Sequence, residues 1–425
     1  MLQRSQVKQS RRKRILHKMD NNSYKLTKQI FEGVRDFDPA QTFECGQCFR
    51  WTREKDKSYS GIVNGHFANV SYNNEEDTIT VWSNYMPESE AFRERFWRNY
   101  FDLDRDYSVI KKTLTRHDPI MEDAIEMGSG IRILNQEPWE TLVSFLISQN
   151  SNIPRITGCI ELLCKEFGEK IGRFSGRDLY TFPTMKKIAT LFEADLESCK
   201  LGYRAKYLVE TARQIDLDGG GLLAAGHLIE TEKIEKYLLS LSGVGPKVAH
   251  CIMLFAMKKM EIFPIDVWMK RVMNRLYGID EDNVVEMQAY AKEHFGEYGG
   301  IAQQYLFNYI RKENLIDTEE FYMSETDGDD EPAYLQYLEQ DDEETQAVHD
   351  ELDVEEEQLN QEDLTVQDSQ EDETVFDELN ELDEIEEELE EIDAQQELDV
   401  QNQQDKQLDE ENQTEEDDTN LGLIT

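Results

Sequence analysis

Two kinds of hydrophobic pattern follow one another along the first three quarters of the chain. Between about Thr27 and Asn84, short runs of β-branched and aromatic residues are separated by polar turn residues, which predicts strands. Asn64-Gly65 is a residue pair that is favoured in two-residue hairpin loops, and it joins strands predicted at 59–63 and 66–72. Another strand is predicted at 78–82. We therefore expect an antiparallel sheet.

From Glu88 onward the apolar residues recur with the helical period. The clearest helix starts at Pro138, behind which apolar side chains fall at i, i+3, i+4, i+7 and i+8: Trp139, Leu142, Val143, Leu146 and Ile147. Further helices are predicted at 156–167, 185–191, 205–215, 234–241, 247–257, 267–277, 284–295 and 301–312. The expected fold class is α+β, with an N-terminal antiparallel sheet domain at 19–125 and a mostly helical domain at 126–316.

Both ends of the chain have a composition unlike that of the body. Residues 317–425 hold 46 Asp and Glu and a single base, Lys406, with no Trp and few Gly or Pro. Such a segment buries too little apolar surface to offset chain entropy, so we expect a disordered acidic tail. Residues 1–18 form a basic extension, also expected to be disordered, and Met19 is a second candidate start.

The tail accounts for the net charge of the protein. The sequence carries 90 acids and 45 bases, a formal charge of −45, which taken alone argues against a nucleic-acid partner. Without the 46 acids and one base of the tail, residues 1–316 hold 44 of each and have no net charge. The total charge therefore does not exclude nucleic acid as a partner of the body.

Several other classes of protein are disfavoured by the sequence. The longest unbroken apolar run, from Cys251 to Met257, is too short to span a bilayer, and no apolar stretch follows the basic start as in a secretory signal. The six cysteines suggest no disulfide framework, which favours a reducing compartment. Cys45 and Cys48 form a C-x-x-C, but no second pair or histidine pair completes a zinc site, so we expect no metal.

The segment LSGVGPKVAHCI at 241–252 is the most informative of the chain. Gly243 and Gly245 are expected to allow a hairpin between two helices that is too tight for Cβ atoms. Backbone N–H groups at the start of the following helix, as far as Val248, can bind a phosphate without reading base sequence. A simple packing turn is the alternative for this motif on its own.

Two side chains near this hairpin carry candidate chemistry. Lys247 begins an otherwise apolar helix, where a charged amine is poorly solvated and the neutral, nucleophilic form is favoured. Nineteen residues later, Asp266 has the position of a helix N-cap, which is the commonest role for such a residue. Near a buried lysine the same carboxylate could stabilise positive charge on a sugar ring.

The chain resembles the 8-oxoguanine DNA glycosylase/AP lyases, a family of the helix-hairpin-helix GPD superfamily. The resemblance covers roughly 37–311 and rests on GQCFRW at 46–51, SQNSNIPRITG at 148–158, LGYRAKY at 201–207, and the hairpin with its lysine–aspartate pair. It implies a base-excision repair enzyme that flips 8-oxoguanine out of double-stranded DNA, opposite cytosine, excises it and cleaves the abasic strand by β-elimination.

The resemblance also implies a role for individual residues. Lys247 would attack C1′ and form a Schiff base, while Asp266 would stabilise the oxocarbenium-like transition state. In the expected base pocket, the backbone carbonyl of Gly46 would read the N7 proton. Cys251 and Phe307 would sandwich the base, and Gln303 would contact its Watson–Crick edge. On the opposite side of the site, Tyr203 would wedge into the base stack and Asn150 would fill the space that the flipped base leaves. Arg155 and Arg204 would hydrogen-bond the cytosine that has lost its partner.

Four positions depart from the family pattern: Ser151, Pro154, His250 and Trp268. None of them removes the catalytic pair. The resemblance implies no required cofactor, and the superfamily suggests a monovalent cation at the hairpin carbonyls of Leu239, Leu241 and Val244. We expect a monomer whose partner is 8-oxoguanine-containing duplex DNA and no membrane, in the cytoplasm with the bacterial nucleoid, or in the nucleus if the protein is eukaryotic.

Two other functions stay open at this point. The first is a glycosylase for alkylated bases on the same fold, and the second is a non-catalytic DNA-binding adaptor that acts through its tail. For the tail we favour a solvated extension that raises solubility. DNA mimicry, in which the acidic residues compete for the DNA-binding groove, and binding to an unknown basic partner are the alternatives.

Overall fold

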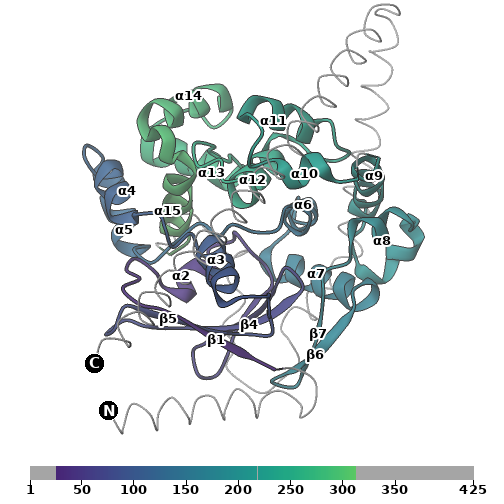
Figure 1. The fold of residues 1–425 in the computed structure, drawn as a ribbon. Helices are drawn as coiled ribbons and strands as arrows, with labels where there is room; N and C mark the ends of the chain where they lie inside the picture. The colour runs from purple at the N-terminus through teal and green to yellow at the C-terminus, as the bar shows by residue number, and fades with distance from the viewer. Residues whose placement is uncertain (1–24, 218, 313–425) are drawn as a thin grey trace, which may run out of the picture. The chain divides into compact units, whose positions relative to one another are not determined.

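The computed structural model describes residues 25–217 and 219–312 (Figure 1). The basic extension predicted at 1–18 and the acidic tail predicted at 317–425 lie outside the described residues. None of the described helices combines the length and the apolar character that crossing a bilayer requires.

The predicted antiparallel sheet is confirmed. It has five strands in the order β1-β5-β4-β3-β2, which are β1 (Thr27–Phe31), β2 (Trp51–Arg53), β3 (Tyr59–Val63), β4 (His66–Asn73) and β5 (Thr78–Ser83). Val63 pairs with His66 across Asn64 and Gly65, whose φ angles are +47° and +75°. Positive φ at both central positions is what a two-residue hairpin turn demands, and Asn-Gly supplies it at low cost.

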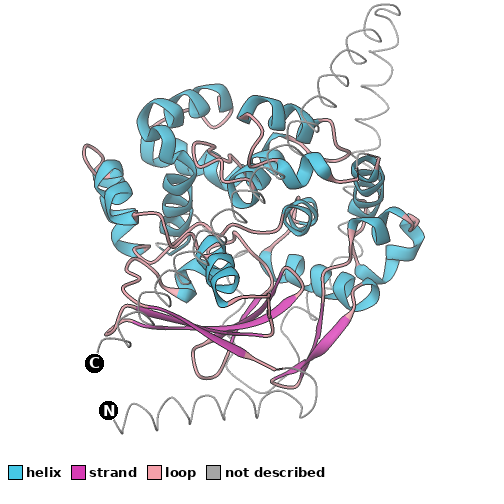
Figure 2. Ribbon diagram, in the orientation of Figure 1, coloured by secondary structure: helices cyan, strands magenta, loops and turns pink. Residues whose placement is uncertain are grey.

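Each helix predicted from the periodicity is present, and the structure adds several short ones (Figure 2). The helices are α2 (Pro39–Phe43), α3 (Glu90–Tyr100), α4 (Tyr107–Leu114), α5 (Pro119–Met127), α6 (Pro138–Ile147), α7 (Ile153–Phe167), α8 (Met185–Ala189), η1 (Glu193–Cys199), α9 (Arg204–Asp216), α10 (Gly221–Ala225), α11 (Thr231–Leu239), α12 (Pro246–Ala256), α13 (Val267–Tyr277), α14 (Val284–Phe295), η2 (Gly296–Tyr298) and α15 (Gly299–Lys312). The α+β fold class is therefore confirmed.

A second, two-stranded sheet inside the helical part was not predicted. It is a hairpin of β6 (Lys170–Phe174) and β7 (Arg177–Tyr180), drawn beside the large sheet in Figure 1. Phe174 is fully buried, with its ring centre 4.7 Å from that of Phe67 in β4. Four of the nine strand residues are charged, so the apolar pattern of this hairpin is weak, and contact with a distant sheet supplies its burial.

Helix α6 lies inside the helical part and positions the candidate site. Eight of its ten residues are buried, and it packs against α7, α9 and α12. A helix that is apolar on nearly all sides needs neighbours on all sides, which the surrounding helices provide. Its C-terminal end leads into the loop that carries the SQN motif, and α12 carries Lys247, so this packing brings two predicted motifs together.

Candidate active site

The hairpin between α11 and α12 requires glycine at only one of its two glycine positions. Gly243 has φ +70°, and a Cβ atom there would lie 2.4 Å from the side chain of Tyr207. For Gly245 the prediction of crowding is wrong, because a Cβ atom would meet nothing within 4 Å. The first bond of α12 runs from the N–H of Ala249 to Gly245 O (3.0 Å), so the N–H of Val248 points out of an uncovered helix start.

Lys247 and Asp266 line one groove, each at the beginning of a helix. The Lys247 amine donates a hydrogen bond to Ser148 Oγ (3.1 Å) and lies 5.1 Å from the ring centre of Phe145. Asp266 caps α13 as predicted, since its Oδ1 accepts from the N–H of Met269 (2.7 Å). Within residues 25–217 and 219–312, no ion pair joins this lysine to this aspartate.

The residues predicted for the base pocket are partly brought together. Gly46 has φ +86° and lies beside Phe307, whose ring would be 3.4 Å from a Cβ atom at this glycine. Cys251 follows Lys247 by about one helical turn, and burial raises the pKa of its thiol to about 11, so the group is neutral at pH 7. Gln303 is buried, and its side-chain oxygen accepts from Gln304 Nε2 (2.8 Å). Their contacts with a base stay predictions.

The residues predicted for the opposite side of the site gather around the loop after α6. Asn150 is exposed with φ +45°, and Arg155 lies in the first turn of α7 on the groove. Arg204 is buried and donates hydrogen bonds to the backbone oxygens of Gln149 (2.9 Å) and Asn150 (2.9 Å). Its guanidinium also lies 4.6 Å from the ring centre of Tyr203. Arg204 thus supports the loop, while its contact with cytosine stays a prediction.

Three of the four departures from the family pattern lie where a ligand would pass: Ser151, Pro154 and Trp268 line the groove. His250 does not, since its Nε2 pairs with Glu235 Oε1 of α11 at 2.7 Å. The exchange at this position therefore affects how α11 packs against α12, and the other three affect the surface offered to a ligand.

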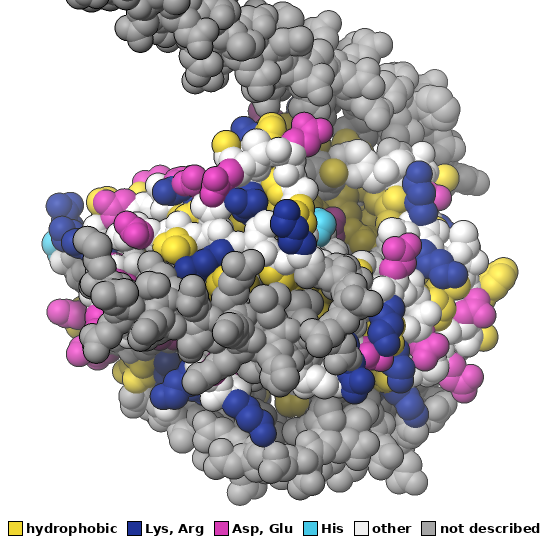
Figure 3. All heavy atoms as spheres, turned by 60° about the horizontal axis from the view of Figure 1, so that its bottom comes forward, with side chains coloured by type: hydrophobic (Ala, Val, Ile, Leu, Met, Phe, Trp, Pro, Cys, Tyr) yellow, Lys and Arg dark blue, Asp and Glu magenta, His cyan; other side chains and the backbone are white. Residues whose placement is uncertain are grey.

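The groove is much more basic than the chain around it. Residues 25–312 carry 37 Lys and Arg and 42 Asp and Glu, a net charge of −5. The described residues lining the groove include only four acids, and eleven bases: Arg50, Arg53, Arg155, Lys165, Arg173, Arg177, Lys247, Lys270, Arg271, Arg311 and Lys312. Figure 3 shows one face of the molecule, with Lys and Arg side chains interspersed with Asp and Glu and a hollow with hydrophobic side chains. The excess of bases over acids among the residues that line the groove attracts a polyanion despite the negative total.

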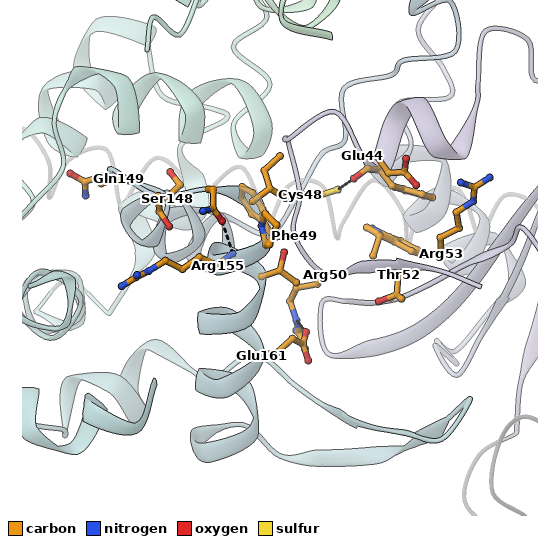
Figure 4. Close-up of a pocket in the computed structure, with 18 of the residues that line it drawn as sticks. Glu44, Cys48, Phe49, Arg50, Thr52, Arg53, Ser148, Gln149, Arg155 and Glu161 are labelled. Atoms are coloured by element: carbon orange, nitrogen blue, oxygen red, sulfur yellow. Dashed lines mark hydrogen bonds and ion pairs between the residues drawn. The ribbon is translucent and has the colours of Figure 1, made fainter. Parts of the chain in front are cut away.

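The sequence interpretation missed four supporting residues. Arg50 is buried where sheet and helices meet, and it donates to Tyr180 O (2.6 Å) with Glu161 Oε1 3.5 Å from its Nε (Figure 4). Arg311 donates a hydrogen bond to Glu44 O (2.7 Å), and its guanidinium carbon lies over Phe307, 6.0 Å from the ring centre. Phe145 and Ser148 contact the lysine amine. Arg50 and Ser148 belong to the motifs at 46–51 and 148–158, which could have pointed to them, whereas Arg311 belongs to no motif.

No three His, Cys, Asp or Glu side chains of the described segments converge to hold a metal ion. Cys45 and Cys48 are buried, and their thiols donate to the backbone oxygens of Thr42 (3.3 Å) and Phe43 (3.5 Å). At the hairpin, Leu241 O already accepts from the N–H of Val244 (3.1 Å), which leaves one lone pair for a cation. The monovalent cation stays a prediction.

Comparison with known proteins decides the family. Residues 29–142 match the family model of the 8-oxoguanine DNA glycosylase N-terminal domain, and residues 143–297 match that of HhH-GPD superfamily base excision DNA repair proteins. An N-glycosylase/DNA lyase of Saccharomyces cerevisiae is 35% identical over 261 residues, which are 56% of this chain and 68% of that protein. The chain belongs to the 8-oxoguanine DNA glycosylase family.

Two further relatives are similar to this chain along most of their own length. A probable N-glycosylase/DNA lyase of Methanothermobacter thermautotrophicus is 29% identical over 311 residues, 67% of this chain and 96% of that protein. The Clostridium acetobutylicum 8-oxoguanine glycosylase/lyase, solved with double-stranded DNA containing cytosine opposite 8-oxoguanine, is 37% identical with a TM-score of 0.62. It covers 70% of this chain and 99% of its own. The resemblance and the predicted enzyme class are confirmed.

Proposed function

We propose that this protein excises 8-oxoguanine paired with cytosine in duplex DNA and then cleaves the abasic strand. The observation that carries the proposal is Lys247, whose amine lies in a basic groove at the start of α12 with Asp266 on the same groove. Family membership and the named activities of the relatives support the substrate class.

In the first step, the neutral amine of Lys247 attacks C1′ of the flipped nucleotide. The bond between C1′ and N9 breaks, and the base leaves with the electron pair and takes up a proton. Positive charge on the sugar peaks in the transition state, where the carboxylate of Asp266 would stabilise it. A nucleophilic amine attached to the protein keeps the sugar covalently bound after the base has left.

In the second step, the sugar ring opens and the nitrogen of Lys247 forms an imine with C1′. The imine makes the C2′ proton acidic, and its removal expels the 3′ phosphate oxygen in a β-elimination. Water then hydrolyses the imine and releases the lysine. A glycosylase that used water instead of lysine would leave the abasic strand uncut.

Recognition of the lesion requires that the base leave the stack. Unstacking costs a few kcal/mol, which the wedge Tyr203, the filler Asn150 and the cytosine ligands would offset. In 8-oxoguanine, N7 carries a proton, and this N7–H would donate a hydrogen bond to the backbone carbonyl of Gly46. Guanine presents an acceptor there, and two unpaired buried acceptors facing one another would cost about 1–3 kcal/mol.

Borohydride trapping tests the proposal directly. We expect the full-length protein to form a covalent adduct with an 8-oxoguanine:cytosine duplex and none with the matched undamaged duplex. Lys247→Gln should abolish the adduct, because an amide cannot form an imine. No adduct with the wild type, or an adduct that persists in Lys247→Gln, would contradict the lysine mechanism.

The same assay with other duplexes separates the alternatives. Duplexes with 8-oxoguanine opposite each of the four bases measure the opposite-base preference, for which we expect cytosine. An adduct or base release only with 3-methyladenine DNA would favour the alkylated-base glycosylase. Tight binding to every duplex without base release or strand cleavage would favour the non-catalytic adaptor.

A further inference from the structure

Ser148 ends α6 with its hydroxyl proton already engaged. Its backbone N–H donates to Ser144 O (3.0 Å), and its Oγ donates to Phe145 O (2.8 Å). Carbonyls in the last turn of a helix lack helical partners, so this hydroxyl satisfies one of them. A hydroxyl has one proton and two lone pairs. The oxygen of Ser148 therefore presents only lone pairs to whatever lies on its other side.

The group on that side is the amine of Lys247. Its Nζ lies 3.1 Å from Ser148 Oγ, and 99 positions separate the two residues in the sequence. For residues 25–217 and 219–312 this is the one hydrogen bond of the amine, and no carboxylate forms an ion pair with it. The Phe145 ring covers the amine from the same helix at 5.1 Å. Helix α6 thus holds the tip of a flexible side chain that comes from α12.

A neutral acceptor suits an amine that has to act as a nucleophile. A carboxylate at this position would stabilise the ammonium form and withhold the lone pair. A hydroxyl with a free proton could donate that proton to the amine nitrogen, which would also occupy the lone pair. Because the proton of Ser148 is engaged by Phe145, the neutral amine donates one N–H to Oγ and its lone pair stays available for C1′.

The position of Ser148 is itself held from two directions. The next residue, Gln149, donates from Nε2 to Gly243 O (3.2 Å) in the hairpin expected to bind phosphate, and its own backbone oxygen accepts from Arg204. The serine therefore sits between the hairpin and the loop expected to face the opposite strand. The contact between Ser148 and Lys247 ties the orientation of the amine to both segments that are expected to face DNA.

We propose that Ser148 is a positioning residue for the nucleophile: its hydroxyl oxygen, oriented by Phe145 O, holds the amine of Lys247 ready for attack on C1′. The inference rests on the proposed function, because it takes the lysine as the nucleophile. It does not depend on which base is excised, since the amine attacks the sugar.

An abasic-site duplex provides the test, because it reports on the lysine without requiring base recognition. In the full-length protein, we expect Ser148→Ala to lower the single-turnover rate of borohydride trapping by about 10- to 100-fold, with the Kd for the duplex unchanged within about twofold. Ser148→Thr keeps a hydroxyl and should recover most of the rate. Ser148→Asp should shift the pH–rate profile to higher pH, because a carboxylate favours the ammonium form.

Ser240→Ala is the matched control. Ser240 ends α11 with the same side-chain contact, from Oγ to Tyr237 O at 2.7 Å, and it does not line the groove. Its loss removes the same contact at the end of a helix and should leave trapping at the wild-type rate. A wild-type rate in Ser148→Ala, or a rate loss matched by an equal loss of DNA affinity, would overturn the inference.

The experiment also separates this inference from the proposed function. A wild type that traps abasic DNA but neither binds nor traps the 8-oxoguanine duplex would refute the proposed substrate. The comparison of Ser148 variants on abasic DNA would then still support or overturn the positioning role.

Discussion

At the scale of single residues, Asp266 combines two tasks in one carboxylate. Its Oδ1 accepts the N–H of Met269 at 2.7 Å and begins α13, while the half-buried side chain also lines the groove with Lys247. Capping requires only an acceptor oxygen, whereas stabilising a cationic sugar requires a negative charge. Substitution can therefore separate the two tasks.

We expect Asp266→Asn to keep the free energy of unfolding within about 0.5 kcal/mol, because asparagine also caps helices. The same variant should slow borohydride trapping on the 8-oxoguanine duplex by about 100-fold or more, since the charge is lost. Asp266→Ala should in addition lower the free energy of unfolding by about 1 kcal/mol. Urea unfolding and single-turnover trapping measure the two effects.

Asn283→Ala serves as the control for the loss of a cap. Asn283 begins α14, where its Oδ1 accepts from the N–H of Glu286 at 3.1 Å, and it does not line the groove. Asn283→Ala should lower the free energy of unfolding by about as much as Asp266→Ala does and leave the rate of borohydride trapping unchanged. If Asp266→Asn is trapped at the wild-type rate, capping is the whole role of the aspartate.

At the scale of elements, the buried guanidinium of Arg50 joins the segment before β2 to β7, α6 and α7. It donates to Tyr180 O in β7 at 2.6 Å, and its nearest distances to Glu140 of α6 and Glu161 of α7 are 3.7 and 3.5 Å. Two carboxylates beside one buried cation repel each other. Burial raises the pKa of Glu140 to about 7, because the loss of hydration outweighs the attraction of Arg50.

This pKa predicts the pH dependence of stability. Between the ordinary carboxyl pKa of 4.5 and about 7, the folded protein binds more protons at Glu140 than the unfolded chain does. The free energy of unfolding therefore falls as pH rises through this window. Since Glu140→Gln does not titrate, the difference in the free energy of unfolding between wild type and variant should fall by on the order of 3 kcal/mol and level off above the window.

Urea unfolding at a series of pH values measures that difference. Glu126→Gln, on the exposed side of α5, controls for the loss of a carboxylate at the surface. A difference that instead rises with pH would show that attraction by Arg50 outweighs burial.

At the scale of the whole molecule, charge is divided between separate parts of the chain. Eleven bases and four acids line the groove, although residues 25–312 have a net charge of −5 and residues 317–425 add −45. Attraction of DNA at the groove depends on the nearby charges, because screening limits distant ones to about 10 Å in moderate salt. The protein can thus bind a polyanion locally while its total charge is strongly negative.

For the tail we expect a solubility role. Deleting residues 317–425 should leave the affinity for undamaged duplex and its dependence on salt unchanged, and should lower solubility. Binding titrations at several salt concentrations measure both quantities. A deletion variant that binds more tightly at low salt, with a changed salt slope, would instead support DNA mimicry by the acidic residues.

Local patterns predicted most of the elements and part of the site. The Asn64-Gly65 turn, the start of α6 at Pro138 and the cap at Asp266 each depend on residues within one or two turns, so the sequence alone contains the information. Family motifs pointed to Lys247 and to the loop after α6. The crowding expected at Gly245 was wrong, because what a Cβ atom would meet depends on distant residues.

By itself, the sequence determined the α+β class, the separation of the acidic tail from a neutral body, and the family with its lysine–aspartate pair. The tertiary structure decided which groups surround that pair. Ser148 meets Lys247 across 99 positions, and Phe174 of the second hairpin is buried against Phe67. Contacts of this kind arise when amphipathic elements pack, and packing geometry leaves no periodic signal in the sequence of either partner.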